Sequence, residues 1–210
     1  FSLIIFLVCN LLIIYNSYNI ELFRDIPKFN LYNSNNNIIK NTDWEFGEQQ
    51  MLNEYIKPND FVLQLGGNLG TSCILVDKIL DNKQNNICVE PHPEILEILN
   101  KNKELNGAKF NIVNGIITET CNVKLDVNCE TCGGPNKYGS RISNKGDINI
   151  NCVKLEHIPN YTNINVLFAD CEGCLCKFFN EYNWILNQLR LVIYEPDQID
   201  ICNYDTIDLQ

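Results

Sequence analysis

Four acidic residues follow short apolar runs, at positions in the chain where a ligand site is expected. They are Glu90, Asp170, Glu172 and Glu195. In open α/β sheets, ligands bind outside the carboxyl ends of the strands. Carboxylates at that edge can hold ribose hydroxyls, and they can remove a proton from a reacting hydroxyl. We therefore expect these four side chains to line one edge of a parallel sheet.

A glycine turn precedes the first of these acids. Residues 61–65 are mostly apolar, as in a buried parallel strand, and the sequence GGNLG at residues 66–70 ends that strand. Thr71 is a candidate cap for the helix that follows, and the next strand, residues 86–89, leads to Glu90. Such a unit places an anionic ligand group at the helix N-terminus and a carboxylate near a ribose. The pattern therefore predicts a nucleoside-cofactor site.

The spacing of the glycines separates two cofactor classes. A dinucleotide fingerprint, G-x-G-x-x-G, that ended on Gly67 and Gly70 would need a glycine where the chain has Leu65. Gly66 and Gly70 instead fit the looser G-x-x-x-G pattern of S-adenosylmethionine enzymes. Glu90 follows at an offset close to the roughly 20 residues expected for a ribose-binding acid. The alternative is an ordinary doubly wound domain whose first turn binds nothing.

Length and charge bound the class of protein. The chain has 210 residues, enough for one α/β domain with a sizeable core. Its formal net charge is −10, which argues against nucleic acid as the main partner because phosphate binding needs a basic surface. Asparagine tracts such as residues 33–37 indicate a compositional bias rather than chemistry.

The N-terminal residues differ in composition from the remainder. Residues 1–15 are almost entirely apolar, but a helix of that length is shorter than the roughly 30 Å hydrocarbon core of a bilayer. Upstream residues would complete a span, so residues 1–20 are expected to be a signal anchor or a signal segment. This would place the protein in a membrane or in the secretory pathway, whereas a buried helix or strand would leave it cytoplasmic. Residues 21–42 are expected to be a linker, and residues 43–210 the folded domain.

Strands and helices are expected to alternate after the linker. A capping box of Thr42 with Glu45 predicts a helix before the first strand. Later strands are expected at residues 110–113, 165–169 and 189–195, and helices after residues 93 and 173. Residues 118–147 show no period. This order predicts an α/β fold with a mostly parallel sheet, helices on both faces and right-handed crossovers. The chain ends soon after the fifth strand, so a final hairpin is not expected.

Roughly residues 44–196 resemble the FkbM family of S-adenosylmethionine-dependent methyltransferases. The motifs that carry the resemblance are IKPNDFVL at residues 56–63, VEPHP at 89–93, YGS at 138–140, DCEG at 170–173 and VIYE at 192–195. The fourth is similar to the family motif D-x-E-G. The resemblance implies a class I, Rossmann-like fold and methyl transfer to an oxygen of a sugar or another small hydroxyl acceptor.

The expected site follows from these motifs. We place Gly66, Asn68 and Gly70 around the methionine portion of the cofactor and Glu90 on the ribose hydroxyls. The residues expected to bind S-adenosyl-L-methionine are Gln64, Gly66, Asn68, Gly70, Glu90, Pro91 and Asn114. Asp170 and Glu172 are the candidates for binding the acceptor or removing its proton, unless one of them caps the following helix. His92 is expected beside the adenosine, and a small-molecule or glycan acceptor is the expected partner.

Two positions depart from the family pattern. The family usually has an acid where this chain has Gln64, and a lysine where it has Phe168. The alternative function is therefore a catalytically degenerate cofactor-binding protein, or a cysteine-stabilised structural protein on the same fold.

The chain contains 11 cysteines, and two groups of them are closely spaced. The groups are Cys129 with Cys132, and Cys171, Cys174 and Cys176. This spacing fits either a zinc site or disulfides, and disulfides follow if the domain lies in an oxidising lumen. We assign no metal ligands.

Overall fold

Six parallel strands form the central sheet of the computed structural model, which describes residues 3–6, 25–127 and 139–204. In spatial order the strands are β1 (Leu3–Phe6), β13 (Leu191–Tyr194), β12 (Val166–Ala169), β4 (Val62–Leu65), β5 (Asn86–Glu90) and β6 (Asn111–Asn114). Every neighbouring pair is parallel. The sequence-based prediction of a mostly parallel α/β sheet is confirmed, and Leu3–Phe6 adds an edge strand beside β13.

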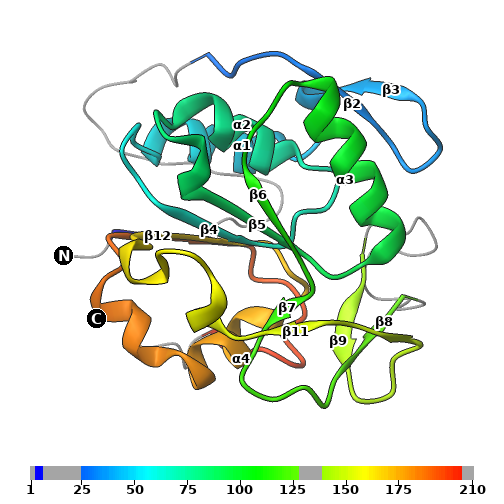
Figure 1. The fold of residues 1–210 in the computed structure, drawn as a ribbon, viewed down its shortest axis with the longest axis vertical. Helices are drawn as coiled ribbons and strands as arrows, with labels where there is room; N and C mark the ends of the chain where they lie inside the picture. The colour runs from blue at the N-terminus through cyan, green and yellow to red at the C-terminus, as the bar shows by residue number, and fades with distance from the viewer. Residues whose placement is uncertain (1–2, 7–24, 128–138, 205–210) are drawn as a thin grey trace.

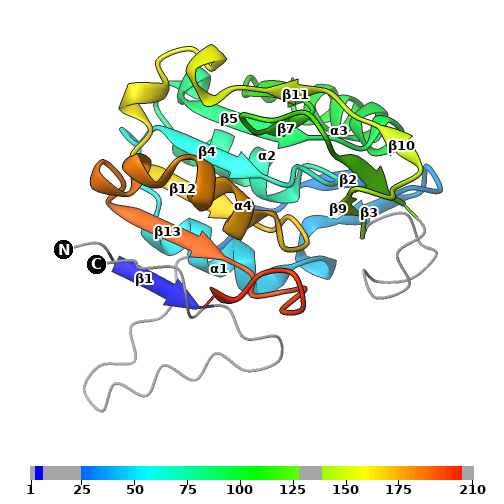
Figure 2. The ribbon, with the colours of Figure 1, turned by 90° about the horizontal axis from the view of Figure 1, so that it is seen from below.

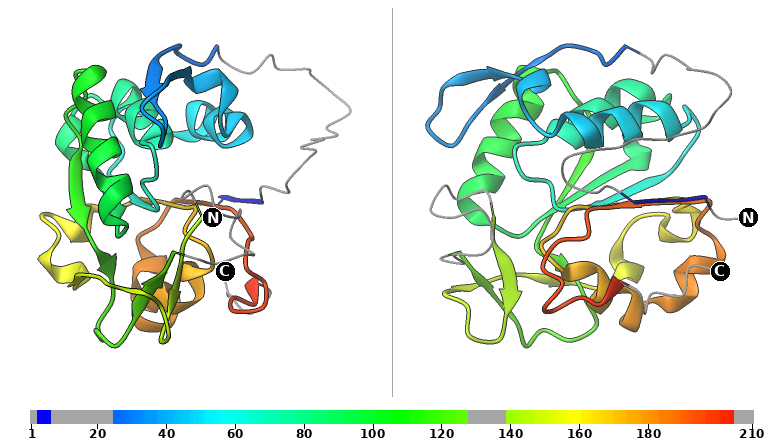
Figure 3. Two further views of the ribbon diagram at one scale, coloured as in Figure 1. Left: turned by 90° about the vertical axis from the view of Figure 1, so that its right-hand side faces the viewer. Right: turned by 180° about the vertical axis from the view of Figure 1, so that it is seen from behind.

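Helices cover both faces of this sheet (Figures 1 and 3). The four α-helices are α1 (Phe46–Tyr55), α2 (Thr71–Ile79), α3 (Pro93–Leu105) and α4 (Cys174–Glu181). The first three lie on one face, and α4 lies on the other, across β12 and β13 (Figure 2). Five short 3₁₀ helices complete the described helical structure: η1 (Asn41–Asp43), η2 (Lys83–Asn85), η3 (Leu155–His157), η4 (Tyr161–Asn163) and η5 (Asn183–Asn187).

The sheet separates two apolar cores because successive strand residues point to opposite faces. Val62 of β4 packs with α1 and α2, whereas Leu63 packs with α4 and the 3₁₀ helices. All four residues of β4, β12 and β13 are buried, as expected for a parallel sheet covered on both sides. Both faces of these three strands are therefore covered, so a ligand would reach them at the strand ends.

Three smaller sheets lie around the central one. Strands β8 (Lys124–Asp126), β9 (Arg141–Ser143) and β10 (Ile148–Asn149) pair antiparallel, and β7 (Ile116–Ile117) pairs with β11 (Cys152–Val153). Residues 118–147, which show no period in the sequence, therefore hold β8 and β9 in their described part. Strands this short carry too little sequence for a period-two pattern to be read.

Residues 30–40, assigned to the linker from the sequence, form a hairpin of β2 (Asn30–Tyr32) and β3 (Ile38–Lys40). The asparagine tract is its turn: the Oδ1 atom of Asn33 accepts hydrogen bonds from the backbone N–H groups of Asn35 and Asn37, at 3.0 and 2.9 Å. The hairpin packs on α3, where the Nδ2 atom of Asn102 donates to the carbonyl of Tyr32 at 2.9 Å. In this part of the chain the linker prediction is therefore wrong, since asparagine side chains supply the turn's hydrogen bonds.

Two predicted helix caps are also wrong. Helix α1 begins at Phe46 with Glu45 as its N-cap residue, and no side chain accepts a capping hydrogen bond there. Helix α2 begins at Thr71 itself, with Gly70 as the N-cap residue. Only α3 has a side-chain cap among the four α-helices described: the Nδ1 atom of His92 accepts from the N–H of Glu94 at 3.2 Å. Gly107, with φ +61°, follows the C-cap residue Asn106 of α3, a position at which glycine is common.

Four disulfides join eight cysteines of the described residues. They link Cys73 with Cys88, Cys121 with Cys152, Cys171 with Cys174, and Cys176 with Cys202. The zinc interpretation is wrong for Cys171, Cys174 and Cys176, because a cysteine in a disulfide offers no thiolate ligand. Cys129 and Cys132 lie outside the described residues.

None of the helices described is both long enough and apolar enough to cross a bilayer.

Candidate functional site

A cavity of about 340 Å³ opens at the carboxyl ends of the central strands. This volume lies within the range of small-molecule sites. Its floor comes from the ends of β4, β5 and β12, and α4 and the small strands close its sides. All four acids singled out in the sequence line it, namely Glu90, Asp170, Glu172 and Glu195. The prediction that they share one edge of the sheet is confirmed.

Glu90 fastens the glycine turn to β5. Its Oε2 atom accepts hydrogen bonds from the backbone N–H groups of Gly67 and Asn68, at 3.1 and 2.8 Å. Its Oε1 atom accepts one from the N–H of His92 at 2.7 Å. The side chain is buried, and burial raises the pKa of Glu90 although these three hydrogen bonds lower it. Glu90 therefore organises the turn, and its Oε1 atom keeps room for one more donor.

Gly66 brings the turn against the end of β12. It has φ +95°, and a Cβ atom there would overlap the backbone carbonyl oxygen of Asp170. Strands β4 and β12 are neighbours, and the helices that follow them lie on opposite faces of the sheet. This is the topological switch point at which open α/β sheets bind ligands. Only glycine fits at position 66, because a side chain would separate the two strand ends.

Five carboxylates gather at one end of the cavity. Oxygen atoms of Glu45, Glu48 and Asp170 lie within 4.8 Å of one another, as do those of Asp170, Glu195 and Asp197. Two full charges at that distance repel by about 3 kcal/mol at an effective dielectric constant of about 20. Burial raises the pKa of Glu45 to about 7. Burial and the neighbouring carboxylates hold the pKa values of Glu48 and Asp170 well above their usual range.

Asp197 connects this cluster to α4. Its Oδ1 atom accepts hydrogen bonds from the N–H of Gly173 at 2.9 Å and from the hydroxyl of Tyr204 at 2.8 Å. Gly173 is the N-cap residue of α4, so Asp197 satisfies the first donor of that helix. The alternative role of Asp170 or Glu172 as the side-chain cap is therefore wrong. Glu172 instead accepts from the Nε2 atom of Gln198 at 2.8 Å, and burial raises its pKa to about 7.

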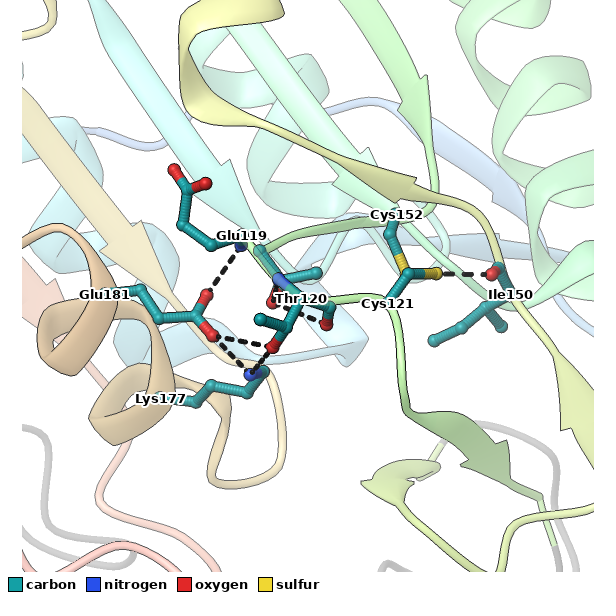
Figure 4. Close-up of a disulfide and its surroundings, with 8 residues drawn as sticks. Glu119, Thr120, Cys121, Ile150, Cys152, Lys177 and Glu181 are labelled. Carbon is teal, nitrogen blue, oxygen red and sulfur yellow. Dashed lines mark hydrogen bonds and ion pairs between the residues drawn. A yellow bond between two sulfur atoms is a disulfide. The ribbon is translucent and has the colours of Figure 1, made fainter.

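Lys177 is the only lysine or arginine among the described residues that line the cavity. Its ammonium group pairs with Glu181 at 2.5 Å and lies 3.5 Å from the hydroxyl of Thr120. Figure 4 shows this group beside the disulfide of Cys121 with Cys152. The positive charge of Lys177 is therefore compensated by Glu181, outside the acidic cluster.

Comparison of the chain with protein-family models, with curated proteins and with solved structures found no match.

The structure divides the residues expected to bind the cofactor. Gly66, Asn68, Glu90 and Pro91 line the cavity, whereas Gln64, Gly70 and Asn114 do not. Gln64 is fully buried within the sheet, where its Nε2 atom donates to the Oδ1 atom of Asn86 at 2.6 Å. A Cβ atom at Gly70 would meet Leu99 of α3, so this glycine serves the packing of α2 on α3.

Other residues of the site were missed. His92 lines the cavity, as expected. The sequence predicts only a capping role for Glu45 and none for Glu48, although both belong to the acidic cluster. The available signal was the pair of acids at spacing i, i+3, which places two side chains on one face of a helix. The apolar wall is contributed in part by Ile116, Ile117 and Ile142 from the small strands.

Proposed function

We propose that the protein is an S-adenosylmethionine-dependent methyltransferase that acts on a hydroxyl group of a sugar or another small molecule. The observation that carries the proposal is the cavity at the switch point between β4 and β12, with a glycine turn on one side and carboxylates on the other. The resemblance of residues 44–196 to the FkbM family supports the same reaction.

The turn offers an unused group to a nucleoside cofactor. Asn68 lines the cavity with φ +43°, and its Oδ1 atom is buried without a hydrogen-bond partner among the described residues. A buried acceptor of this kind is costly unless a ligand donates to it. We assign it, together with the Oε1 atom of Glu90, to the hydroxyl and amino groups of the cofactor.

Methyl transfer needs little acid-base chemistry, because the bound sulfonium is already a strong electrophile. What the chain must supply is alignment of the acceptor oxygen and removal of its proton. Glu172 lines the cavity, and its pKa of about 7 suits a group that takes up a proton near neutral pH. Asp170 lies beside it and would hold the acceptor hydroxyl.

Calorimetric titration of the disulfide-intact protein with S-adenosylhomocysteine tests the proposal. We expect saturable binding, and Asn68→Gly should weaken it about 3- to 10-fold, the value of one hydrogen bond. Glycine is chosen because it adopts the positive φ of this position without strain. The matched control is Asn59→Gly in an exposed turn, which should bind like the wild type. Absence of binding at about 1 mM ligand would refute the methyltransferase proposal.

The disulfides bear on where the protein works. Structural disulfides persist in oxidising compartments. We therefore infer that the domain resides in a secretory or extracellular compartment. This inference rests on the disulfides alone, because Leu3–Phe6, inside the segment expected to be a signal or an anchor, forms strand β1 of the central sheet. Peptide mapping of protein from its native source, alkylated before reduction, should find the four linkages; free thiols at these eight positions would overturn the inference.

A further inference from the structure

The acidic cluster at the end of the cavity is assembled from three separate segments. Glu45 and Glu48 come from the start of α1, Asp170 from the end of β12, and Glu195 and Asp197 from the chain that follows β13. The five form two groups that share Asp170, and within each group the nearest oxygen atoms lie within 4.8 Å of one another. Two oxygen ligands on opposite sides of one Ca²⁺ ion are separated by about 4.6–5.2 Å, and by about 4.0–4.2 Å around Mg²⁺. Within each group of three, the spacing therefore fits ligands around a single ion, and Asp170 belongs to both groups.

A second observation points to a missing positive partner. The side chain of Glu48 is only 8% exposed, and the charged groups of the described residues that act on its carboxylate are other carboxylates, those of Glu45, Glu195 and Asp197. The carboxylate of Asp170 receives no hydrogen bond from the described part of the chain, and the Oδ2 atom of Asp197 is buried without a partner there. Buried carboxylates are normally paired, hydrogen-bonded or bound to a metal.

Among the described residues, Lys177, Arg190 and Arg141 do not supply this positive charge. Lys177 pairs with Glu181 on the other side of the cavity. Arg190 forms a bidentate pair with Asp60, which precedes β4 and therefore lies at the opposite end of the strands. Arg141 pairs with Asp126 and Asp200.

We propose that Glu45, Glu48, Asp170, Glu195 and Asp197 form a binding site for a hard divalent cation, Mg²⁺, Mn²⁺ or Ca²⁺, with Asp170 as the central ligand. The ligand set selects this class because all five donors are carboxylate oxygens, which suit Mg²⁺, Mn²⁺ and Ca²⁺ rather than softer metals. The competing state is one in which the same carboxylates share protons instead of an ion.

The site also has a role in the reaction, and that role, unlike the site, rests on the proposed function. Glu45, Asp170 and Glu195 line the cavity, so an ion held by them faces the space where an acceptor would bind. A divalent cation that coordinates a hydroxyl oxygen lowers the pKa of that hydroxyl and fixes its position. The acceptor class that fits is therefore one with an oxygen able to coordinate the ion, such as a vicinal diol of a sugar.

Titration of chelator-treated, disulfide-intact protein tests the site without any cofactor. Free Mn²⁺ is followed by electron paramagnetic resonance, and Mg²⁺ and Ca²⁺ by calorimetry. We expect one ion per chain with a dissociation constant of about 10 μM to 1 mM. No binding of any of the three ions up to about 5 mM would overturn the proposal and favour the protonated cluster.

Two variants locate the ion. Asp170→Asn and Glu48→Gln keep the shape of each side chain and should each weaken binding at least about 10-fold, the effect expected for loss of a charged ligand. Glu97→Gln, which removes an exposed charge on α3, should bind like the wild type. Unchanged affinity in Glu48→Gln and in a folded Asp170→Asn would place the ion elsewhere and overturn the assignment. Cation binding without S-adenosylhomocysteine binding would support the cation site and refute the methyltransferase proposal. S-adenosylhomocysteine binding without cation binding would support the methyltransferase proposal and refute the cation site.

Discussion

Replacement of Glu90 should reveal how strongly one carboxylate holds the glycine turn. Glu90→Ala removes the acceptor of three backbone N–H groups, which donate to it over 2.7–3.1 Å. An orphaned buried donor costs about 1–3 kcal/mol, so the gross loss is roughly 3–9 kcal/mol. Two effects reduce it: water from the cavity can reach part of the turn, and the burial that raises the pKa of Glu90 also makes its charge costly. We expect a net loss of about 2–5 kcal/mol from the free energy of unfolding.

Glu90→Gln should be milder, because the amide oxygen can still accept from Gly67 and Asn68. Its NH₂ group would then face the N–H of His92, which leaves one donor without an acceptor and predicts a loss of about 1–3 kcal/mol. Urea unfolding followed by circular dichroism, with the disulfides intact, measures both variants. Glu97→Gln is the matched control and should change stability by less than about 0.5 kcal/mol.

A loss below about 1 kcal/mol for Glu90→Ala would refute the idea that Glu90 organises the turn. If that stable variant also bound S-adenosylhomocysteine much more weakly, Glu90 would be a ligand group rather than a structural one. The two roles are therefore separable in one pair of measurements.

Two further predictions concern the turn and the disulfides. Gly66→Ala should lower the free energy of unfolding by more than about 3 kcal/mol, because its Cβ atom would overlap the carbonyl oxygen of Asp170. The control Gly107→Ala, also at positive φ but with open space around it, should lower it by only about 1–2 kcal/mol. Similar shifts of the melting temperature in the two variants would contradict this prediction. Stepwise reduction, followed by mass spectrometry, should open the disulfide of Cys171 with Cys174 first, because these two cysteines line the cavity. The disulfide of Cys73 with Cys88 should open later, because both cysteines are fully buried. The opposite order would show that solvent access does not govern reduction here.

The main elements of the fold could be read from local patterns. The apolar runs before Glu90, Asp170 and Glu195 are buried strands, and each lies within two residues of the expected position. A buried parallel strand can be predicted from a few consecutive apolar residues. The residues that follow parallel strands lie at the same edge of the sheet, at the carboxyl ends of the strands. For this reason the sequence predicts correctly that the four acids share one edge of the sheet.

Features that depend on contacts between distant segments could not be read in this way. The asparagine tract looked like a compositional bias, but Asn33 closes a hairpin that rests on Asn102 of α3. Cysteine spacing allowed either zinc or disulfides, and only the fold brings Cys176 beside Cys202. Gln64 stood at the family's cofactor position, yet its side chain is buried against Asn86.

The sequence by itself determined a parallel α/β domain with a glycine turn and acids at the strand ends, because hydrophobic period and turn residues are local properties of the chain. Only the tertiary structure decided which groups meet at the site. Glu45 and Glu48 join Asp170 because α1 packs on one face of the central sheet, an arrangement set by strand order and helix packing rather than by spacing. The same packing leaves Glu48 buried without a positive partner among the described residues. This observation is the reason for proposing that the acidic cluster binds a cation.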